Sequence, residues 1–205
     1  MAPLTRGLQL LASAIRYALA SAGLVTPPLL SRPTPCAEWD VAVLLDHVSD
    51  SASVLHQAIT AGCVSPGPPP GGGSPGLGPV HGLHRQATRL LAVCTAAGPA
   101  QQLAAVGDRD LTTSMVALAG ALEITVHGWD ISAACGAHRP IPPGLAVILL
   151  PLAPLLITPA TRTGLFADRV PVPAQASPGD QLLAFLGRRP HPPPAARTAG
   201  NRRPS

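Results

Sequence analysis

Glu123 and His127 are the residues whose types and spacing most directly suggest chemistry in this sequence. They lie four positions apart in "ALEITVHGWD" (residues 121–130), an apolar stretch that otherwise predicts a buried helix. Side chains at positions i and i+4 of a helix are neighbours, so a single metal ion could contact both. A partly exposed Glu–His pair, or a histidine hydrogen-bonded in the core, is the alternative that these two residues leave open.

His47, in "LLDHVSD", is a third candidate on a different predicted helix. It adjoins Leu44 and Val48 on the inward face of that helix, whereas helical geometry puts His56 on the opposite face. Two histidines and one glutamate from two helices are typical of a catalytic zinc site that keeps one position open for water or substrate. Taken alone, His47 is also consistent with a hydrogen-bonded core histidine.

Two aspartates follow these histidines at a spacing of three residues: Asp130 after His127, and Asp50 after His47. A carboxylate at that position could accept a hydrogen bond from the imidazole nitrogen that faces away from a metal, and so orient the ring. Each aspartate could equally be a surface charge.

Other reactive residues have less support. His81 and His84 in "HGLHRQ" form a rival pair, but they follow a Gly/Pro-rich segment and are expected to face solvent. Cys36 is either a thiol nucleophile or a buried thiol, and no base accompanies it in sequence. The sequence contains neither the GxSxG pattern of a serine nucleophile nor a phosphate-binding GK[ST] loop.

The charge distribution argues against nucleic acid as a partner. The net charge is +4, and all fourteen basic residues are arginine. Five of these arginines lie in the Pro-rich segment 188–205, which leaves nine arginines against ten acidic residues elsewhere. A basic body surface, which phosphate binding would need, is therefore not predicted. Segment 188–205 is expected to be a disordered basic tail.

The apolar segments favour a cytoplasmic protein without a membrane span. Arg16 interrupts the first apolar run too early for a signal peptide. Residues 144–157, "GLAVILLPLAPLLI", are too few to cross a bilayer and include two prolines. The four cysteines are widely spaced and contain no CxxC pair, so we expect them to be reduced.

Apolar periodicity predicts an all-α fold. The stripe Met115, Ala119, Leu122, Val126, Trp129 and Ala133 is expected to face the core. Segment 62–79 contains seven glycines and six prolines, and is expected to be a flexible loop within one domain, residues 1–187. The expected helices span residues 4–23, 41–61 with Asp40 as N-cap, 80–97, 112–136, 143–157 and 178–186, with extended chain over 164–173. The architecture is an up-and-down four-helix bundle with a C-terminal helical and extended wrap.

Three motifs carry a family resemblance that covers about residues 5–190. "PTPCAEWDVAVLLDHV" and "ALEITVHGWDISAACG" resemble the metal-binding domain family of mycothiol-dependent maleylpyruvate isomerase, within the DinB-like helical-bundle superfamily. "GLFADRVPVPAQASPGDQLLAFLGRRP" is similar to the C-terminal region of a compact branch of that family.

The resemblance implies a DinB-like bundle that binds a divalent metal, typically zinc, at one end. By motif, the implied ligands are His47, Glu123 and His127, the same residues that spacing suggested. Trp39 and Trp129 match tryptophans of the family and are expected to pack around the site. Mycothiol is the implied thiol cosubstrate.

The chain also departs from the isomerase that names the family, which carries a further C-terminal α/β domain. About seventy residues follow the fourth predicted helix, too few for that domain. The leading hypothesis is therefore a metal-dependent thiol transferase or isomerase, acting on a small thiol and an electrophile of unspecified class, with a homodimer as a possible assembly. The alternatives are a non-enzymatic metal-binding or stress-related scaffold, and a plain bundle in which the three polar residues coincide by chance.

Overall fold

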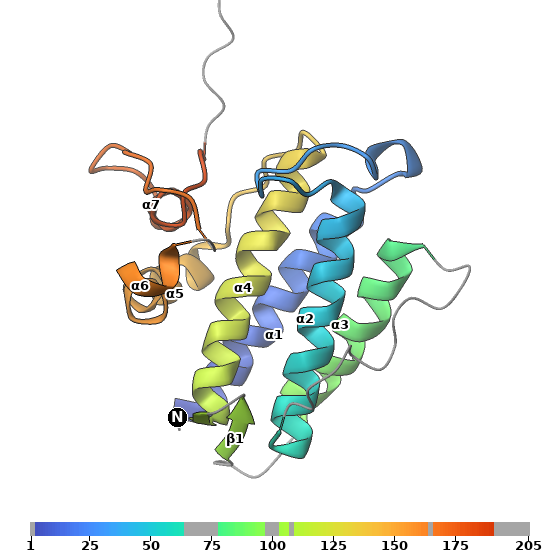
Figure 1. Cartoon of the computed structure of the whole chain (residues 1–205), viewed down its shortest axis with the longest axis vertical. Coiled ribbons are helices and arrows are strands. Elements are labelled where there is room, and N and C mark those ends of the chain that lie inside the picture. The colour runs from blue at the N-terminus through green and yellow to red at the C-terminus, as the bar shows by residue number, and fades with distance from the viewer. Residues whose placement is uncertain (1–2, 64–77, 97–102, 107–108, 164–165, 191–205) are drawn as a thin grey trace, which may run out of the picture.

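The computed structural model describes residues 3–63, 78–96, 103–106, 109–163 and 166–190 (Figure 1). Most of the Gly/Pro-rich loop predicted over 62–79 lies outside the described residues, and so does the predicted tail from residue 191 onward. None of the described helices is both long enough and apolar enough to cross a membrane.

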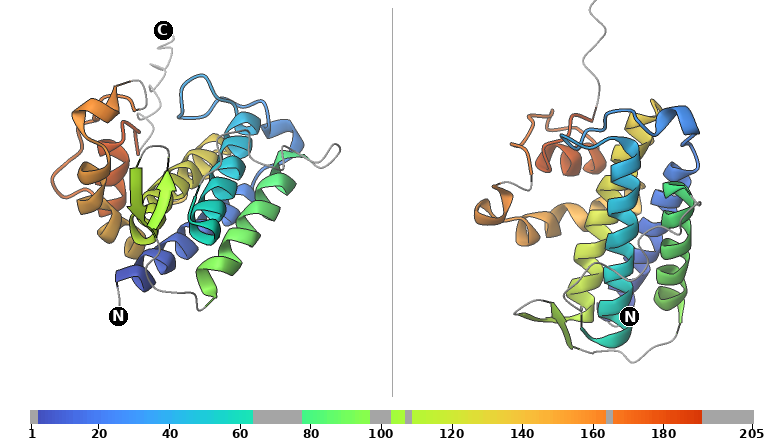
Figure 2. Two further views of the ribbon diagram at one scale, coloured as in Figure 1. Left: turned by 60° about the horizontal axis from the view of Figure 1, so that its bottom comes forward. Right: turned by 45° about the vertical axis from the view of Figure 1, so that its right-hand side comes forward.

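Four long helices form the body of the molecule: α1 (Pro3–Ala22), α2 (Val41–Ala61), α3 (Pro79–Thr95) and α4 (Thr113–Ala134). Both α1 and α2 pack against α3 and α4, which places α1 diagonally opposite α2 in the bundle (Figures 1 and 2). The neighbours α2 and α4 run in opposite directions (Figure 1). The prediction of an all-α, DinB-like four-helix bundle is confirmed, and the start of α2 lies beside the end of α4.

The helix boundaries follow from residues that satisfy free backbone groups. Asp40 caps α2, since its carboxylate accepts a hydrogen bond from the Val43 backbone N–H at 2.9 Å. Thr112 caps α4 in the same way, by accepting from the Met115 N–H at 3.3 Å. Gly62 ends α2 in the left-handed conformation (φ 68°), which glycine adopts without steric cost.

Helix α4 is the central element, with buried residues on nearly all of its sides. It packs against α1, α2 and α5 (Pro143–Leu156). Gly128 permits the contact with α1, because a Cβ at that position would lie 3.1 Å from the Ala18 Cα. The polar side chains of His127 and Asp130 on α4 are consequently surrounded by packed neighbours.

A short antiparallel hairpin precedes α4. Strand β1 (Leu103–Val106) pairs with β2 (Arg109–Thr112), with Leu103 opposite Thr112. The sequence pattern does not predict this hairpin, because four-residue strands are too short to show a clear alternation of apolar and polar residues.

The C-terminal region packs beside the bundle. Helix α5 contacts both α4 and α7 (Pro178–Phe185), and the single-turn α6 (Pro159–Arg162) follows α5 (Figure 2). Residues 166–173, expected to be extended, form neither helix nor strand, and the Val170 N–H donates to the Ala184 carbonyl at 2.9 Å; residues 164–165 lie outside the described residues. A short 3-10 turn (Pro27–Leu29) lies between α1 and α2.

The sequence predicted a disordered tail that begins at residue 188, and Arg188 does not fit that prediction. Arg188 is buried, with 7% of its surface exposed, and it pairs with the fully buried Asp130 on α4. The ordered region therefore extends past residue 187. The physical reason is an ion pair whose acidic partner lies far upstream in the chain.

Candidate metal centre

His47 stands near the beginning of α2, where the preceding loop is tightly tied to the helix. The Arg32 carbonyl accepts from the Val41 N–H at 3.0 Å and the Leu30 carbonyl accepts from the Ala42 N–H at 2.9 Å, so first-turn amides of α2 have partners. The Thr34 hydroxyl donates toward the Trp39 carbonyl at 2.9 Å and thereby closes the loop.

Glu123 and His127 lie one turn apart on α4 and converge with His47. Nε2 of His47 lies 2.8 Å from Oε1 of Glu123, and Nε2 of His127 lies 3.2 Å from the same oxygen. One potential ligand atom from each residue falls within 4.8 Å of the other two. The structure thus brings the three predicted ligands together across the α2–α4 contact, although 76 positions separate His47 from Glu123.

Asp130 holds the other side of the His127 ring. Its Oδ2 lies 3.1 Å from Nδ1 of His127, and the carboxylate is fully buried. The Arg188 guanidinium binds the same carboxylate, with Nη2 donating to Oδ2 at 2.9 Å and Nε donating to Oδ1 at 3.3 Å. The predicted contact between Asp130 and His127 is present, and Arg188 extends it into a chain of three buried polar groups.

The cluster shifts the acidities of its members. Burial alone would raise the pKa of Glu123, but hydrogen bonds from His127 and His47 outweigh it and hold that pKa well below its usual range. Burial would lower the pKa of His127, but the Asp130 and Glu123 carboxylates outweigh it and raise that pKa to about 9. Asp130 likewise raises the pKa of Arg188 against the effect of burial. Without a metal, these shifts favour an anionic Glu123 beside a protonated His127.

The two predicted packing tryptophans have different positions. The Trp39 ring lies 4.5 Å from the His47 ring and 6.1 Å from the His127 ring, between centroids, so it covers the cluster directly. Trp129 is buried in the core, and its ring centroid lies 6.5 Å from that of His138. Of the two, Trp39 is the one in contact with the candidate ligands.

The cluster opens into a pocket of about 850 Å³ between the bundle and the C-terminal region. Its lining combines apolar and polar side chains from both parts of the chain. The apolar ones include Trp39, Leu122, Val126, Leu156, Ile157, Phe166 and Leu186, and the polar ones are Cys36, Glu38, His47, Glu123, His127, Thr161 and Arg188. Such a pocket can receive a small molecule that has an apolar portion and a group directed at the cluster.

Cys36 lines this pocket near Arg188, a placement that the sequence left undecided. Its thiol is half-buried, and burial raises its pKa despite the opposing effect of the Arg188 guanidinium. A raised pKa favours the protonated thiol, which is the less reactive form. This supports the buried-thiol interpretation.

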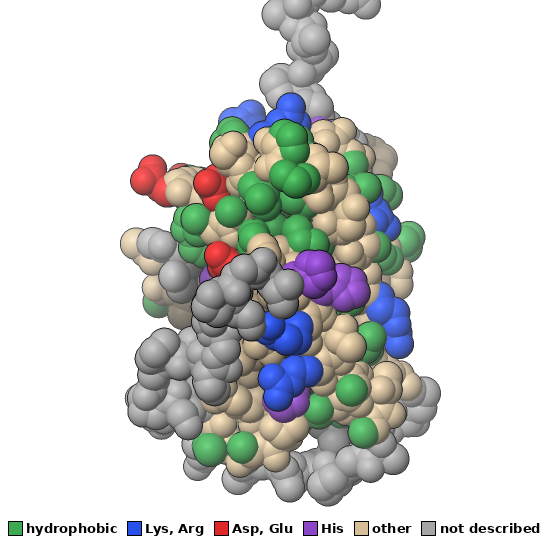
Figure 3. All heavy atoms as spheres, turned by 90° about the vertical axis from the view of Figure 1, so that its right-hand side faces the viewer, with side chains coloured by type: hydrophobic (Ala, Val, Ile, Leu, Met, Phe, Trp, Pro, Cys, Tyr) green, Lys and Arg blue, Asp and Glu red, His purple; other side chains and the backbone are tan. Residues whose placement is uncertain are grey.

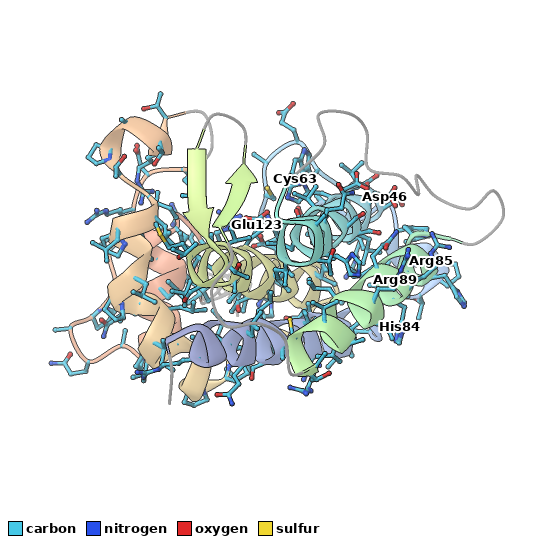
Figure 4. The ribbon with its side chains drawn as sticks, turned by 90° about the horizontal axis from the view of Figure 1, so that it is seen from below. Asp46, Cys63, His84, Arg85, Arg89 and Glu123 are labelled. Carbon is cyan, nitrogen blue, oxygen red and sulfur yellow. The ribbon has the colours of Figure 1, made fainter. Side chains whose placement is uncertain are left out.

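The remaining candidates lie outside the cluster. His81 and His84 are exposed on α3, as predicted. Figure 3 shows a face of the molecule on which histidine and arginine side chains gather. His84 lies away from Glu123 (Figure 4). Asp50 is exposed, and no hydrogen bond joins it to His47 in the part of the chain that the structure describes. His56 is likewise not among the residues that converge on Glu123.

Comparisons with known proteins agree with this arrangement. The family model described as the mycothiol maleylpyruvate isomerase N-terminal domain matches residues 11–132, a span that contains all three candidate ligands and Asp130. Two uncharacterized proteins of Mycobacterium tuberculosis, MT0763 (strain CDC 1551 / Oshkosh) and Rv0738 (strain ATCC 25618 / H37Rv), are each 31% identical over 163 residues. Those alignments cover 78% of this chain and 85% of each relative. No solved structure matches the chain. Because the matched span exceeds half of its length, the chain belongs to the mycothiol maleylpyruvate isomerase N-terminal domain family.

Proposed function

We propose that this protein binds a divalent metal ion, zinc by preference, through His47, Glu123 and His127, and uses it to activate a small thiol for attack on an electrophile. The observation that carries the proposal is the convergence of two imidazole nitrogens and one carboxylate oxygen beside an 850 Å³ pocket. Family membership supports a thiol of the mycothiol type as cosubstrate.

The donor distances fit a metal. Ligands of a tetrahedral zinc ion at about 2.0 Å lie about 3.3 Å from one another. The two imidazole nitrogens stand 2.8 and 3.2 Å from Oε1 of Glu123, close to that separation, and the three donor atoms all lie within 4.8 Å of one another. Two histidines and a glutamate are also a donor set found in zinc enzymes.

The residues around the ligands have definable tasks. Asp130 accepts a hydrogen bond from Nδ1 of His127, so that loss of the Nε2 proton on metal binding would free the Nε2 lone pair of that ring for coordination. The Trp39 ring packs against the rings of His47 and His127. A bound divalent ion with one carboxylate ligand keeps net positive charge and lowers the pKa of a coordinated thiol or water.

The pocket shape supports a transferase or isomerase acting on two small molecules. Its side opposite the bundle comes from the C-terminal region, including Ile157, Phe166 and Leu186. The use of an electrophilic second substrate and the assembly into a homodimer are both predictions.

A combined binding and turnover experiment tests the proposal. Metal-free protein is titrated with Zn²⁺ and Co²⁺, and the loaded protein is then offered mycothiol or cysteine with an α,β-unsaturated acid, an epoxide and an alkyl halide. We expect one metal per chain and thiol consumption that requires both metal and protein. Tight metal binding without turnover of any thiol or of water would instead indicate a metal-binding scaffold. Absence of metal binding would refute the proposal.

A further inference from the structure

Arg188 is a buried cation at the far end of the described chain that reaches the candidate metal centre. It lies just after α7, and its backbone N–H donates to the Leu183 carbonyl at 2.9 Å. Its Nη1 donates to the Leu186 carbonyl at 2.9 Å, and its other two side-chain nitrogens, Nε and Nη2, donate to the Asp130 carboxylate. Three side-chain nitrogens thus have defined partners, which leaves the guanidinium a single orientation.

Gly187 directs Arg188 toward the bundle. Its backbone is left-handed (φ 79°), and a Cβ there would lie 2.8 Å from both the Cβ and the carbonyl oxygen of Ala167. Only glycine meets both conditions without strain. The turn at Gly187 therefore lets the backbone pass close to Ala167, and it points Arg188 at Asp130 instead of at solvent.

Asp130 connects Arg188 to the candidate ligand His127. Its Oδ2 accepts both from Nη2 of Arg188, at 2.9 Å, and from the His127 ring, with Nδ1 at 3.1 Å. Its Oδ1 accepts from Nε of Arg188 at 3.3 Å. A two-point contact with a planar guanidinium fixes the rotation of the carboxylate, which in turn fixes the His127 ring and its tautomer.

We propose that Arg188 is a positioning residue for the metal centre, acting through Asp130 to hold His127 with Nε2 directed at the ion. This inference rests on the proposed function, since it assumes that His127 binds a metal. It also assigns a role to the C-terminal region, which docks onto the bundle and completes the support of the site from 58 residues away. By linkage, metal binding must then strengthen the docking of α7 to the same extent that docking strengthens metal binding.

A simple structural ion pair is the competing explanation, because a buried carboxylate needs a counterion in any case. The two explanations differ in what they predict for metal affinity. A structural pair affects stability and leaves the metal affinity of folded protein unchanged. A positioning residue changes metal affinity, and in the metal-free protein it changes the hydrogen bond at Nδ1 of His127.

The test compares Arg188→Met with Arg189→Met, a matched loss of charge at the exposed neighbouring position. Zn²⁺ affinity is measured by competition with a chromophoric chelator, and the ligand field is followed by Co²⁺ absorption. We expect Arg188→Met to weaken Zn²⁺ binding about 10- to 100-fold, the usual effect of losing a group that supports a metal ligand. Arg189→Met should match the native protein, and Arg188→Lys should recover part of the loss, because lysine restores charge without the planar fork. Folded Arg188→Met with native Zn²⁺ affinity and a native Co²⁺ spectrum would overturn the proposal.

A double variant covers the case in which Arg188→Met does not fold. Arg188→Met with Asp130→Asn removes both buried charges, and it should bind Zn²⁺ as weakly as Asp130→Asn alone, since both residues act along one path. A further tenfold loss on adding Arg188→Met would contradict action through Asp130.

Imidazole ¹⁵N NMR of metal-free protein separates this proposal from the proposed function. Arg188→Met should shift the His127 Nδ1–H signal, while Arg189→Met should not. If native protein binds no metal, the proposed function fails, and the NMR comparison still decides whether Arg188 positions His127. An unchanged Nδ1–H signal in folded Arg188→Met overturns the positioning role on its own.

Discussion

Nδ1 of His127 lies 3.1 Å from Oδ2 of Asp130, one helical turn away on α4, and the aspartate is fully buried. A carboxylate without solvent contact is stable only with paired charge or hydrogen bonds, and Asp130 has Arg188 on its other side. The contact therefore belongs to both the fold and the candidate site.

Asp130→Asn is expected to destabilise the protein strongly. It leaves the buried Arg188 without its charged partner, and breaking one side of a buried pair costs about 3–5 kcal/mol. Asp50→Asn, a change of the same chemistry at an exposed position of α2, should cost less than about 0.5 kcal/mol. Urea unfolding of the metal-free variants measures both values. Equal costs would mean that the Asp130–Arg188 pair contributes nothing to stability.

Gly187→Ala and Gly136→Ala distinguish backbone strain from steric contact. Both glycines have left-handed backbones, with φ of 79° and 78°. A Cβ at Gly136 would meet nothing within 4 Å, so that variant should lose about 1–2 kcal/mol from conformation alone. At Gly187 the Cβ would also clash with Ala167, so the loss should be larger. Thermal unfolding gives the comparison, and a smaller loss for Gly187→Ala would contradict the close approach to Ala167.

The cysteines should react with a thiol reagent in an order set by burial. Cys63 is exposed, whereas Cys94 is buried in the core and burial raises its pKa to about 11. At pH 8 about one part in a thousand of such a thiol is thiolate, the reactive form, and this fraction rises tenfold with each pH unit up to the pKa. Native protein at pH 8 should therefore label at Cys63 first and at Cys94 last, as read by mass spectrometry of peptides. Early labelling of Cys94 would indicate that the α3 face opens readily.

Trp39→Leu is expected to weaken metal binding less than loss of a ligand does, because Trp39 covers the histidine rings without offering a donor to the ion. Its ring centroid stands 4.5 Å from that of His47, and leucine removes this contact. The Zn²⁺ affinity of this variant should fall between those of the native protein and His47→Ala. Trp129→Leu is a comparison in the core away from the cluster, and it should lower stability without changing Zn²⁺ affinity in the folded fraction. Reversed effects of the two substitutions would contradict these placements.

Much of the bundle could be predicted because its signals are local. Asp40 lies directly before an apolar periodic segment and caps α2, as expected. Thr112, the first residue of the predicted helix 112–136, is the cap of α4. The expected core stripe of α4 was less accurate. Met115 is 48% exposed, and Leu122 and Val126 also line the pocket. A helix with neighbours on nearly every side buries residues all around, so a single apolar stripe does not identify its inward face.

Some residues of the candidate site could likewise be predicted from local spacing, whereas others depend on contacts between distant parts of the chain. Glu123 and His127 are one turn apart, so spacing alone indicated that they could act together. His47 was a candidate from its place on the inward face of its own helix, and the packing of α2 against α4 brings it to the other two. Arg188 was missed because its partner lies 58 positions upstream and its Pro/Arg-rich surroundings are typical of a disordered tail. The "WD" pair that follows His127 was the one available signal, since a buried aspartate requires a cation somewhere in the fold.

The most direct test of the metal centre is the metal content of the purified protein. Native protein, His47→Ala, Glu123→Ala and the exposed control His81→Ala are loaded with Zn²⁺, dialysed, and analysed by inductively coupled plasma mass spectrometry. We expect one zinc per chain in native protein and in His81→Ala, and loss of that zinc in His47→Ala and Glu123→Ala. Native protein without bound metal, or retention of zinc by both His47→Ala and Glu123→Ala, would contradict it.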